Sequence, residues 1–191
     1  MAVNVLEVLT DPARIVAAER LLPLDAPRAR ILDRLVRLAA GLVQAPIAML
    51  TIVEGDRQVF AAQTGMPEEL ARAGSTPLAY SICQHAVSRG RPLIVGDAPT
   101  DPLLRDHPAV VDLGVAAYAG IPVVMSSGHA VGTLCAVDVV PRDWSDDQLA
   151  QLALLADFVT DQFELQCLER EAAFRRAWNG VPEMDWKSPR W

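Results

Sequence analysis

The sequence predicts an α+β domain with a covered antiparallel sheet, and three observations carry this prediction. Residues 114–138 form two apolar runs joined by a Ser-Ser-Gly-His turn, which is typical of a β-hairpin. Both runs are apolar on both faces, as expected of central strands with layers packed on each side. Helical and strand patterns surround this hairpin without an internal repeat or a second core, so we expect one domain.

Two helices are expected before the first strand. The Asp-Pro pair at 11–12 suits the start of a helix that runs to about Leu22. Asp25 suits the N-cap of a second helix over 27–42. We expect this second helix to pack on the sheet through an apolar stripe. The stripe consists of Ile31, Leu35, Leu38 and Leu42, with Leu32, Val36 and Ala39 beside it.

The middle of the chain reads as short elements separated by turns. A buried strand over 47–53 and a return strand over 58–63 flank a Glu-Gly-Asp turn. A short helix over 68–73 precedes a longer one over 78–89, which a glycine ends. Residues 92–95 then form a short strand. This order places a helix between two strand segments, as an α+β domain requires.

A loop, a short helix and the central hairpin lead into the last helix. Residues 98–108 are loop-like and 109–113 look helical. Ser145 and Gln148 form a capping box for a helix that reaches about Trp178. Its buried stripe is predicted from residues spaced by three and four positions. These residues are Leu149, Leu152, Ala156, Val159 and Phe163.

The last helix carries more apolar side chains than one domain needs. Leu165, Leu168 and Ala172 continue the apolar pattern beyond the predicted core contacts. A helical extension alone in water is only marginally stable, so we expect a partner helix and a homodimer through a helix bundle. Residues 179–191 lack periodicity and are expected to be a flexible tail.

Composition narrows the partners and the compartment. The net charge of −7, without a basic stripe, argues against nucleic acid. No basic start followed by an apolar run marks a secretory signal, and no apolar run reaches the roughly 18 residues that span a bilayer. The cysteines, at 83, 135 and 167, are too scattered for a disulfide framework. We therefore expect a cytoplasmic protein that contacts neither membrane nor nucleic acid.

Several segments, taken together, resemble the GAF domain in order and spacing over about residues 26–165. They are S-I-C-Q-H-A-V from Ser81, P-L-I-V-G-D-A from Pro92, D-P-L-L-R-D-H-P-A-V from Asp101, A-Y-A-G-I-P-V from Ala117, and G-T-L-C-A-V-D from Gly132. The resemblance leaves 1–25 as an N-terminal helical extension and 166–178 as an extension of the last helix.

The resemblance implies a central antiparallel sheet of five or six strands, with the terminal helices packed on one face. Short helices and loops roof a small-molecule pocket on the other face. GAF domains serve mostly as sensory or regulatory modules and often dimerise through their terminal helices. The signatures of cyclic-nucleotide-binding and bilin-binding members are missing, and the only lysine is Lys187. We therefore expect neither ligand and name no cofactor.

Six residues are candidates for contact with the ligand, and the 97–113 segment is expected to roof the pocket. The candidates are Cys83, Asp97, Val111, Tyr118, Gly120 and Cys135. We expect no metal site, because acidic residues in the 97–107 loop are more often solvated than metal-bound. Cys83 and His85 point in different directions on a helix and cannot easily share a metal. A buried cysteine and a helix-edge histidine are favoured over haem ligation by either.

Most of these candidates have an alternative structural role. Asp97 contacts a ligand or caps the turn that follows its strand. Tyr118 presents its hydroxyl to a ligand or is a core aromatic residue. Cys83 and Cys135 are inert core thiols or a reactive pair, and no Lys or Arg is placed beside either to lower a thiol pKa. Gly120 marks a close approach of a backbone or a ligand inside a strand.

Three functions remain open at this level. The first is a non-enzymatic sensory GAF module that binds a small molecule and signals through its terminal helices to a partner protein. The second is a thiol switch, or a small reductase of free methionine-R-sulfoxide, that uses Cys83 and Cys135. The third is a dimerisation module whose pocket is filled by side chains. The sequence names no ligand and no downstream partner.

Overall fold

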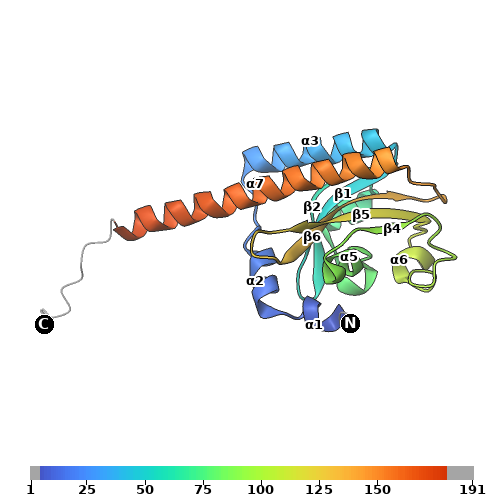
Figure 1. Ribbon diagram of the computed structural model, residues 1–191, viewed down its shortest axis with the longest axis horizontal. Coiled ribbons are helices and arrows are strands. Elements are labelled where there is room, and N and C mark those ends of the chain that lie inside the picture. Colours follow the sequence, from blue (N-terminus) through green and yellow to red (C-terminus); the bar gives the residue numbers. More distant parts are fainter. Residues whose placement is uncertain (1–4, 180–191) are drawn as a thin grey trace, which may run out of the picture.

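The computed structural model describes residues 5–179 and has a six-stranded antiparallel sheet in the order β3-β2-β1-β6-β5-β4 (Figure 1). The strands are β1 (Ile47–Val53), β2 (Arg57–Thr64), β3 (Ser75–Pro77), β4 (Leu93–Val95), β5 (Ala117–Val124) and β6 (Ala130–Asp138). The helices are α1 (Val5–Leu9), α2 (Pro12–Glu19), α3 (Ala26–Val43), α4 (Glu68–Ala73), α5 (Cys83–Arg89), α6 (Pro108–Val111) and α7 (Asp146–Asn179), with a 3-10 turn η1 (Leu78–Tyr80). The α+β fold class is confirmed.

The predicted hairpin lies in the interior of the sheet, as expected. β5 pairs with β4 and β6, while β6 pairs with β1 and β5. Every residue of β6 is buried. Side chains of both strands alternate between two apolar cores, with Ala119 and Leu134 on one side and Tyr118 and Cys135 on the other. This two-sided burial explains the continuous apolar runs of the hairpin.

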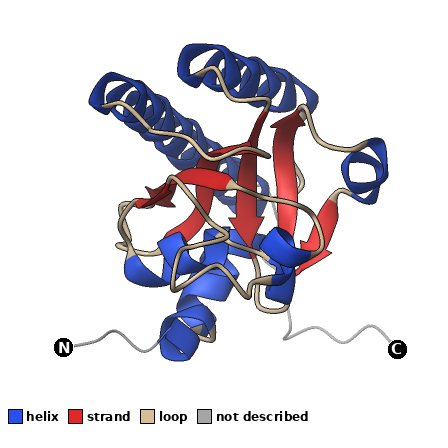
Figure 2. Ribbon diagram, turned by 90° about the vertical axis from the view of Figure 1, so that its right-hand side faces the viewer, coloured by secondary structure: helices blue, strands red, loops and turns tan. Residues whose placement is uncertain are grey.

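The two long helices, α3 and α7, cover one face of the sheet (Figure 2). The capping box of α7 is present, because Ser145 and Gln148 exchange backbone-to-side-chain hydrogen bonds of 3.0 and 3.2 Å. The predicted stripe of α7 is buried from Leu152 to Phe163, with Leu149 partly buried. Past the sheet, α7 continues beyond the rest of the domain (Figure 1).

The stripe of α3 that packs on the sheet differs from the predicted one. Ile31, Leu38 and Leu42 are 38%, 50% and 38% exposed, and Leu35 is only partly buried. The buried stripe lies about 100° further around the helix. It consists of Leu32, Val36, Ala39 and Val43. Two neighbouring apolar stripes exist in the sequence, and periodicity alone does not say which one faces the sheet.

Shorter elements cover the opposite face of the sheet, where α5 packs against β1, β5 and β6. The predicted helix over 78–89 is divided into η1 and α5. Ser81 lies between them in an extended conformation, and its hydroxyl accepts a hydrogen bond from the Gln84 backbone at 3.2 Å. A serine that caps a helix start in this way favours a break rather than a helix interior.

The N-terminal segment closes the end of the sheet near the β1–β2 turn. α2 ends at Glu19 rather than at the predicted Leu22. Arg14 of α2 is only 1% exposed, and its guanidinium donates to four backbone carbonyls. These carbonyls belong to Val8, Leu9, Val53 and Glu54. The expected tail at the other end lies outside the described residues, apart from Asn179, which is the last residue of α7.

Candidate functional site

A cavity of about 150 Å³ lies between the sheet and the elements opposite α3 and α7. Its floor is formed by β1, β2, β5 and β6, and its walls by the 66–70 segment, the η1–α5 junction and the chain around α6. The lining residues are Ile47, Met49, Gln58, Phe60, Met66, Pro67, Leu70, Thr76, Tyr80, Ile82, Cys83, Ala109, Leu113, Val115, Tyr118, Val137 and Val139. Leu113 and Val139 are 42% and 58% exposed, which places them at its mouth.

The lining is apolar. Among the described residues, no Asp, Glu, Lys, Arg or His lines the cavity. Its polar side chains are engaged in hydrogen bonds: the Gln58 amide donates to the Thr76 hydroxyl at 2.8 Å and accepts from the Ser81 hydroxyl at 2.6 Å. The Tyr80 hydroxyl donates to the Asp112 carboxylate at 2.9 Å. The cavity therefore presents a mainly hydrophobic surface to a guest.

Two of the six predicted contact residues, Cys83 and Tyr118, line this cavity. Asp97 and Val111 do not. Val111 is 66% exposed, because α6 turns its apolar residues Ala109 and Val110 inward instead. Asp97 follows β4 outside the cavity lining, and the turn beyond it is capped by Asp101, whose carboxylate accepts from two backbone amides. Of the predicted 97–113 roof, only the last part lines the cavity, through Ala109 and Leu113.

Gly120 and Cys135 lie next to the cavity rather than in its lining. A Cβ on Gly120 would lie 2.2 Å from the Tyr118 hydroxyl oxygen, so the tyrosine ring occupies the space that a side chain would need. The predicted close approach at Gly120 is therefore made by a side chain of the same strand. Cys135 is fully buried beneath Cys83.

The two buried thiols and Tyr118 form a small cluster under the cavity. The sulfurs of Cys83 and Cys135 are 3.8 Å apart, and the Tyr118 hydroxyl donates to the Cys83 sulfur at 3.3 Å. The Cys135 thiol can also donate to the Met49 carbonyl at 3.6 Å. Burial raises the pKa of Tyr118 well above its ordinary value, so its hydroxyl keeps its proton.

Hydrogen bonding, rather than a nearby cation, makes Cys83 the more acidic thiol. A hydrogen bond from Cys135 is the main cause that lowers the pKa of Cys83 to about 7, and bonds from Thr51 and Tyr118 act in the same direction against the effect of burial. The bond to Cys83 and burial raise the pKa of Cys135. The expectation that both thiols are inert for lack of a neighbouring cation omitted these donors.

Several lining residues were not predicted from the sequence. Met49 could have been found, because it alternates with buried positions along a predicted strand. Met66 and Leu70 come from a segment read only as a short helix, and Gln58 and Tyr80 carried no signal for a pocket. Their contribution depends on how α4 and η1 fold back over the sheet.

The sequence model of the GAF domain matches residues 27–162 of this chain. The chain belongs to the GAF domain family. Its layered sheet, with long terminal helices on one face and a cavity on the other, is the arrangement expected from the resemblance in the sequence. Asp138 orients the turn after β6 by accepting from the Val139 and Val140 amides and pairing with Arg142.

Known proteins similar to this chain differ in their activities. A cyclic di-GMP phosphodiesterase of Pseudomonas aeruginosa is 32% identical over 113 residues, which cover 59% of this chain but 18% of the enzyme. The GAF domain of an Acinetobacter phosphoenolpyruvate-protein phosphotransferase has a TM-score of 0.62 at 14% identity and covers 85% of this chain and 99% of its own. A free methionine-R-sulfoxide reductase of Neisseria meningitidis, solved with its substrate, has a TM-score of 0.60 at 20% identity, covering 86% and 91%.

The two solved structures are similar to this chain in fold, and the phosphodiesterase is similar to it in sequence over 113 residues. The chain spans less than a fifth of the length of the phosphodiesterase that it matches. Within residues 5–179, no helix combines the length and the apolar character needed to cross a bilayer.

Proposed function

We propose that this GAF domain is a sensory module that binds a small, uncharged and largely apolar molecule in the cavity above Cys83 and Tyr118. The observation that carries the proposal is an apolar cavity of about 150 Å³ whose described lining holds no charged side chain. An apolar cavity of roughly this volume accommodates a molecule about the size of benzene. The third hypothesis, a pocket filled by side chains, is disfavoured by the same observation.

Size and charge argue against larger or ionised ligands. Pockets for drug-sized ligands measure about 300–1,000 Å³, so haem, a bilin or a cyclic dinucleotide exceeds this cavity. A free amino acid carries an ammonium and a carboxylate, and moving either into an apolar site without a partner is costly. We therefore do not extend the substrates of the phosphodiesterase or the reductase to this chain.

The signal would leave through α7. Met49 and Val137 line the cavity from β1 and β6, and the opposite sides of these strands carry Leu50 and Ala136, which belong to the core shared with α7. A guest that shifts the strands would therefore change the packing of this helix. We infer that α7 passes the change to a second copy of the chain and then to a downstream signalling protein.

Methionine methyl groups test the binding site directly. Met49 and Met66 line the cavity, whereas Met125 is buried in the core on the opposite face of the sheet. With ¹³C-methyl methionine labelling, titration of the reduced protein with benzene should shift the NMR signals of Met49 and Met66 and leave Met125 in place. Cyclic di-GMP, used at the same concentration, should shift none of them.

A pair of variants separates binding in the cavity from binding elsewhere. Val115→Phe fills part of the lining and should weaken the benzene response at least about fivefold, whereas Val111→Phe, on the exposed side of α6, should leave it unchanged. Equal shifts at Met125, or no shift at Met49 and Met66, would contradict the proposal.

A further inference from the structure

We propose that Cys83 and Cys135 form a reversible disulfide in response to a hydroperoxide that enters through the cavity. Cys83 lines the cavity, and Cys135 lies directly beneath it with its sulfur 3.8 Å away. This proposal rests on the two thiols alone and does not depend on the ligand proposed above. It gives the protein a second signal to respond to, which is oxidation of a thiol in the cavity wall.

Access is the first requirement. Both thiols are buried, with Cys83 2% and Cys135 0% exposed, so a bulky oxidant cannot reach them from the surface. The cavity provides a route to Cys83, because its volume of about 150 Å³ exceeds that of several water molecules, each about 30 Å³. Hydrogen peroxide is little larger than water, so it can reach Cys83 before Cys135.

The order of reaction follows from the hydrogen bonds of the two thiols. The donors around Cys83 hold its pKa near 7, so a substantial share of it is thiolate at neutral pH, and the thiolate is the nucleophile. Cys135, with its raised pKa, stays protonated until Cys83 has reacted. Cys83 is therefore the peroxide-reactive residue and Cys135 the resolving residue.

The steps balance without another reactant. The Cys83 sulfur attacks one peroxide oxygen, the O–O bond breaks, and water leaves, giving a sulfenic acid. The Cys135 sulfur then attacks the Cys83 sulfur, the S–OH bond breaks, and a second water leaves with the Cys135 proton. Two thiols are oxidised to one disulfide, and one hydrogen peroxide is reduced to two waters.

The sulfurs must approach by roughly 1.8 Å to reach a disulfide bond length. Cys135 is held in β6 by ladders to both β1 and β5, opposite Met49 and Gly120. Cys83 is the first residue of α5, just after the break at Ser81, so the movement falls on the start of this helix. Ile82 and Cys83 both line the cavity, and the disulfide would therefore change its shape.

Peptide mapping tests the proposal, because trypsin places the three cysteines in separate peptides. Cys83 falls in residues 73–89, Cys135 in 106–142 and Cys167 in 143–170. The full chain is treated with hydrogen peroxide, alkylated with N-ethylmaleimide under denaturing conditions and digested without reductant. We expect residues 73–89 linked to residues 106–142, release of the link by dithiothreitol, and Cys167 alkylated.

Variants assign the roles of the two sulfurs. Cys135→Ser keeps a hydroxyl donor beside Cys83 and should leave Cys83 as a sulfenic acid that dimedone traps, whereas Cys83→Ala should leave Cys135 unoxidised. Tyr118→Phe removes one hydrogen-bond donor to Cys83 and should slow crosslinking about threefold or more. Cys167→Ser, on α7, is the matched control and should crosslink at the wild-type rate.

The peptide map of the wild-type protein tests the disulfide even if a variant fails to fold. Alkylation of both peptides in full, at peroxide doses that oxidise Cys167, would overturn the proposal. A link from either peptide to Cys167 would overturn it as well. The benzene titration uses reduced protein, so failure of one experiment leaves the other interpretable.

Discussion

Gly120 and Tyr118 show, at the scale of single residues, why a glycine stands inside a buried strand. A Cβ at position 120 would meet three atoms of the Tyr118 side chain at 2.2–2.6 Å. Distances under about 3 Å force one group to move, and both residues lie in the closely packed interior. The glycine therefore sets where the tyrosine hydroxyl lies, and with it the hydrogen bond to Cys83.

Gly120→Ala should destabilise the protein by roughly 1–3 kcal/mol, as overpacking of a core does. The added methyl must displace the Tyr118 ring, which lines the cavity. Urea denaturation measures the free energy of unfolding. The matched control is Gly41→Ala at an exposed position of α3, where a Cβ meets nothing within 4 Å, and it should stabilise by about 0.5–1 kcal/mol. Equal effects of the two substitutions would contradict this explanation.

His85 makes stability depend on pH. Its ring lies edge-on to His107, 5.7 Å away, and burial lowers the pKa of His85 to about 4, with His107 and Arg89 acting in the same direction. An unperturbed histidine has a pKa of 6.5, as His85 would in the unfolded chain. Between pH 6.5 and pH 4 the unfolded chain therefore binds a proton at this residue that the folded protein does not, and protonation favours unfolding. The contribution of neutral His85 to the free energy of unfolding is fully present above about pH 6.5 and is lost as the pH falls toward 4.

His85→Gln should therefore flatten the loss of stability between pH 6.5 and pH 4. The free energy of unfolding is measured by urea denaturation at half-unit steps across this window. The same series on the wild-type protein is the comparison. A slope unchanged in His85→Gln would contradict this role of His85.

The site was only partly predictable from individual residues. The structure places Tyr118 and Cys83 in the cavity lining, and their contact with a ligand stays a prediction. Asp97 and Val111 lie outside the cavity lining, because the turn from a strand end and the facing of a one-turn helix depend on loop geometry. The low pKa of Cys83 arises from donors on three separate segments, which no sequence spacing reveals.

At the scale of elements, regular patterns were predicted well and tertiary choices were not. The bounds of β1 and α4 agree with the prediction, because a buried strand and a short capped helix have local signals. β3 was missed, since three residues with a proline carry no periodicity. The buried face of α3 was wrong because two apolar stripes compete, and only packing against the sheet selects between them.

The element whose anchoring was not foreseen is α2. Its Arg14 fork donates to four backbone carbonyls, and burial lowers the pKa of this guanidinium. Arg14→Lys keeps a cation but cannot serve four acceptors in this planar arrangement. It should destabilise the fold by roughly 2–4 kcal/mol, as unsatisfied buried acceptors do.

Urea denaturation of Arg14→Lys beside Arg34→Lys checks this expectation. Arg34 is exposed on α3, so its substitution should change the free energy of unfolding by no more than about 0.5 kcal/mol. A similarly small effect at position 14 would mean that α2 docks through its apolar residues, such as Ala18, rather than through the arginine.

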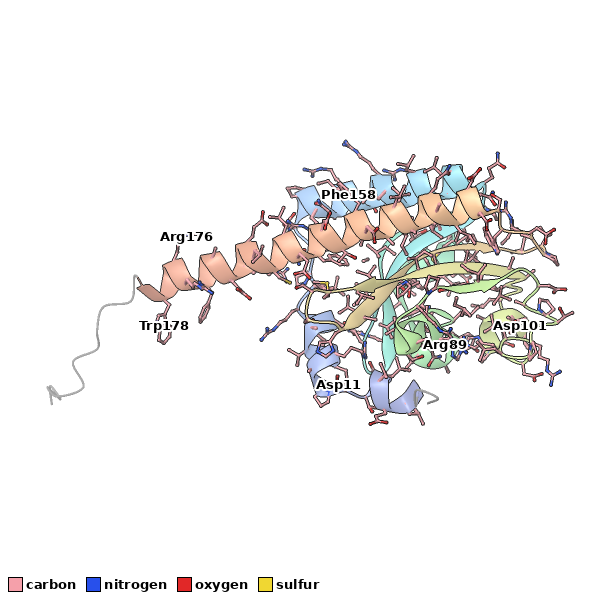
Figure 3. All side chains as sticks on the ribbon, viewed as in Figure 1. Asp11, Arg89, Asp101, Phe158, Arg176 and Trp178 are labelled. Atoms are coloured by element: carbon pink, nitrogen blue, oxygen red, sulfur yellow. The ribbon has the colours of Figure 1, made fainter. Side chains whose placement is uncertain are left out.

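At the scale of the whole molecule, α7 has two apolar stripes on opposite sides. One is buried against the sheet from Leu152 to Phe163. The other is exposed, with Leu154, Phe158, Leu165 and Leu168 between 45% and 69% accessible, and helical spacing puts these four on one side. The part of α7 that bears Arg176 and Trp178 extends beyond the domain (Figure 3). A helix with an exposed apolar stripe is only marginally stable alone in water, so α7 is better suited to a helix bundle.

The exposed stripe of α3 suits the same bundle. Ile31, Leu38 and Leu42 are exposed on the helix that packs beside α7, so both helices carry exposed apolar side chains. Two such helix pairs related by a twofold axis would form a four-helix bundle, in which each stripe is buried by its partner. The homodimer expected from the sequence stays a prediction, now with defined contact residues.

Phe158→Glu combined with Leu165→Glu should dissociate this dimer without unfolding the domain, because both side chains are on the exposed stripe and a buried carboxylate without a partner is costly. Light scattering after size exclusion should give twice the chain mass of 20.7 kDa for the wild type and the chain mass for the variant. Leu103→Glu with Val111→Glu adds the same charge to exposed sites near α6 and should remain dimeric. A wild-type monomer at micromolar concentration would contradict the predicted homodimer.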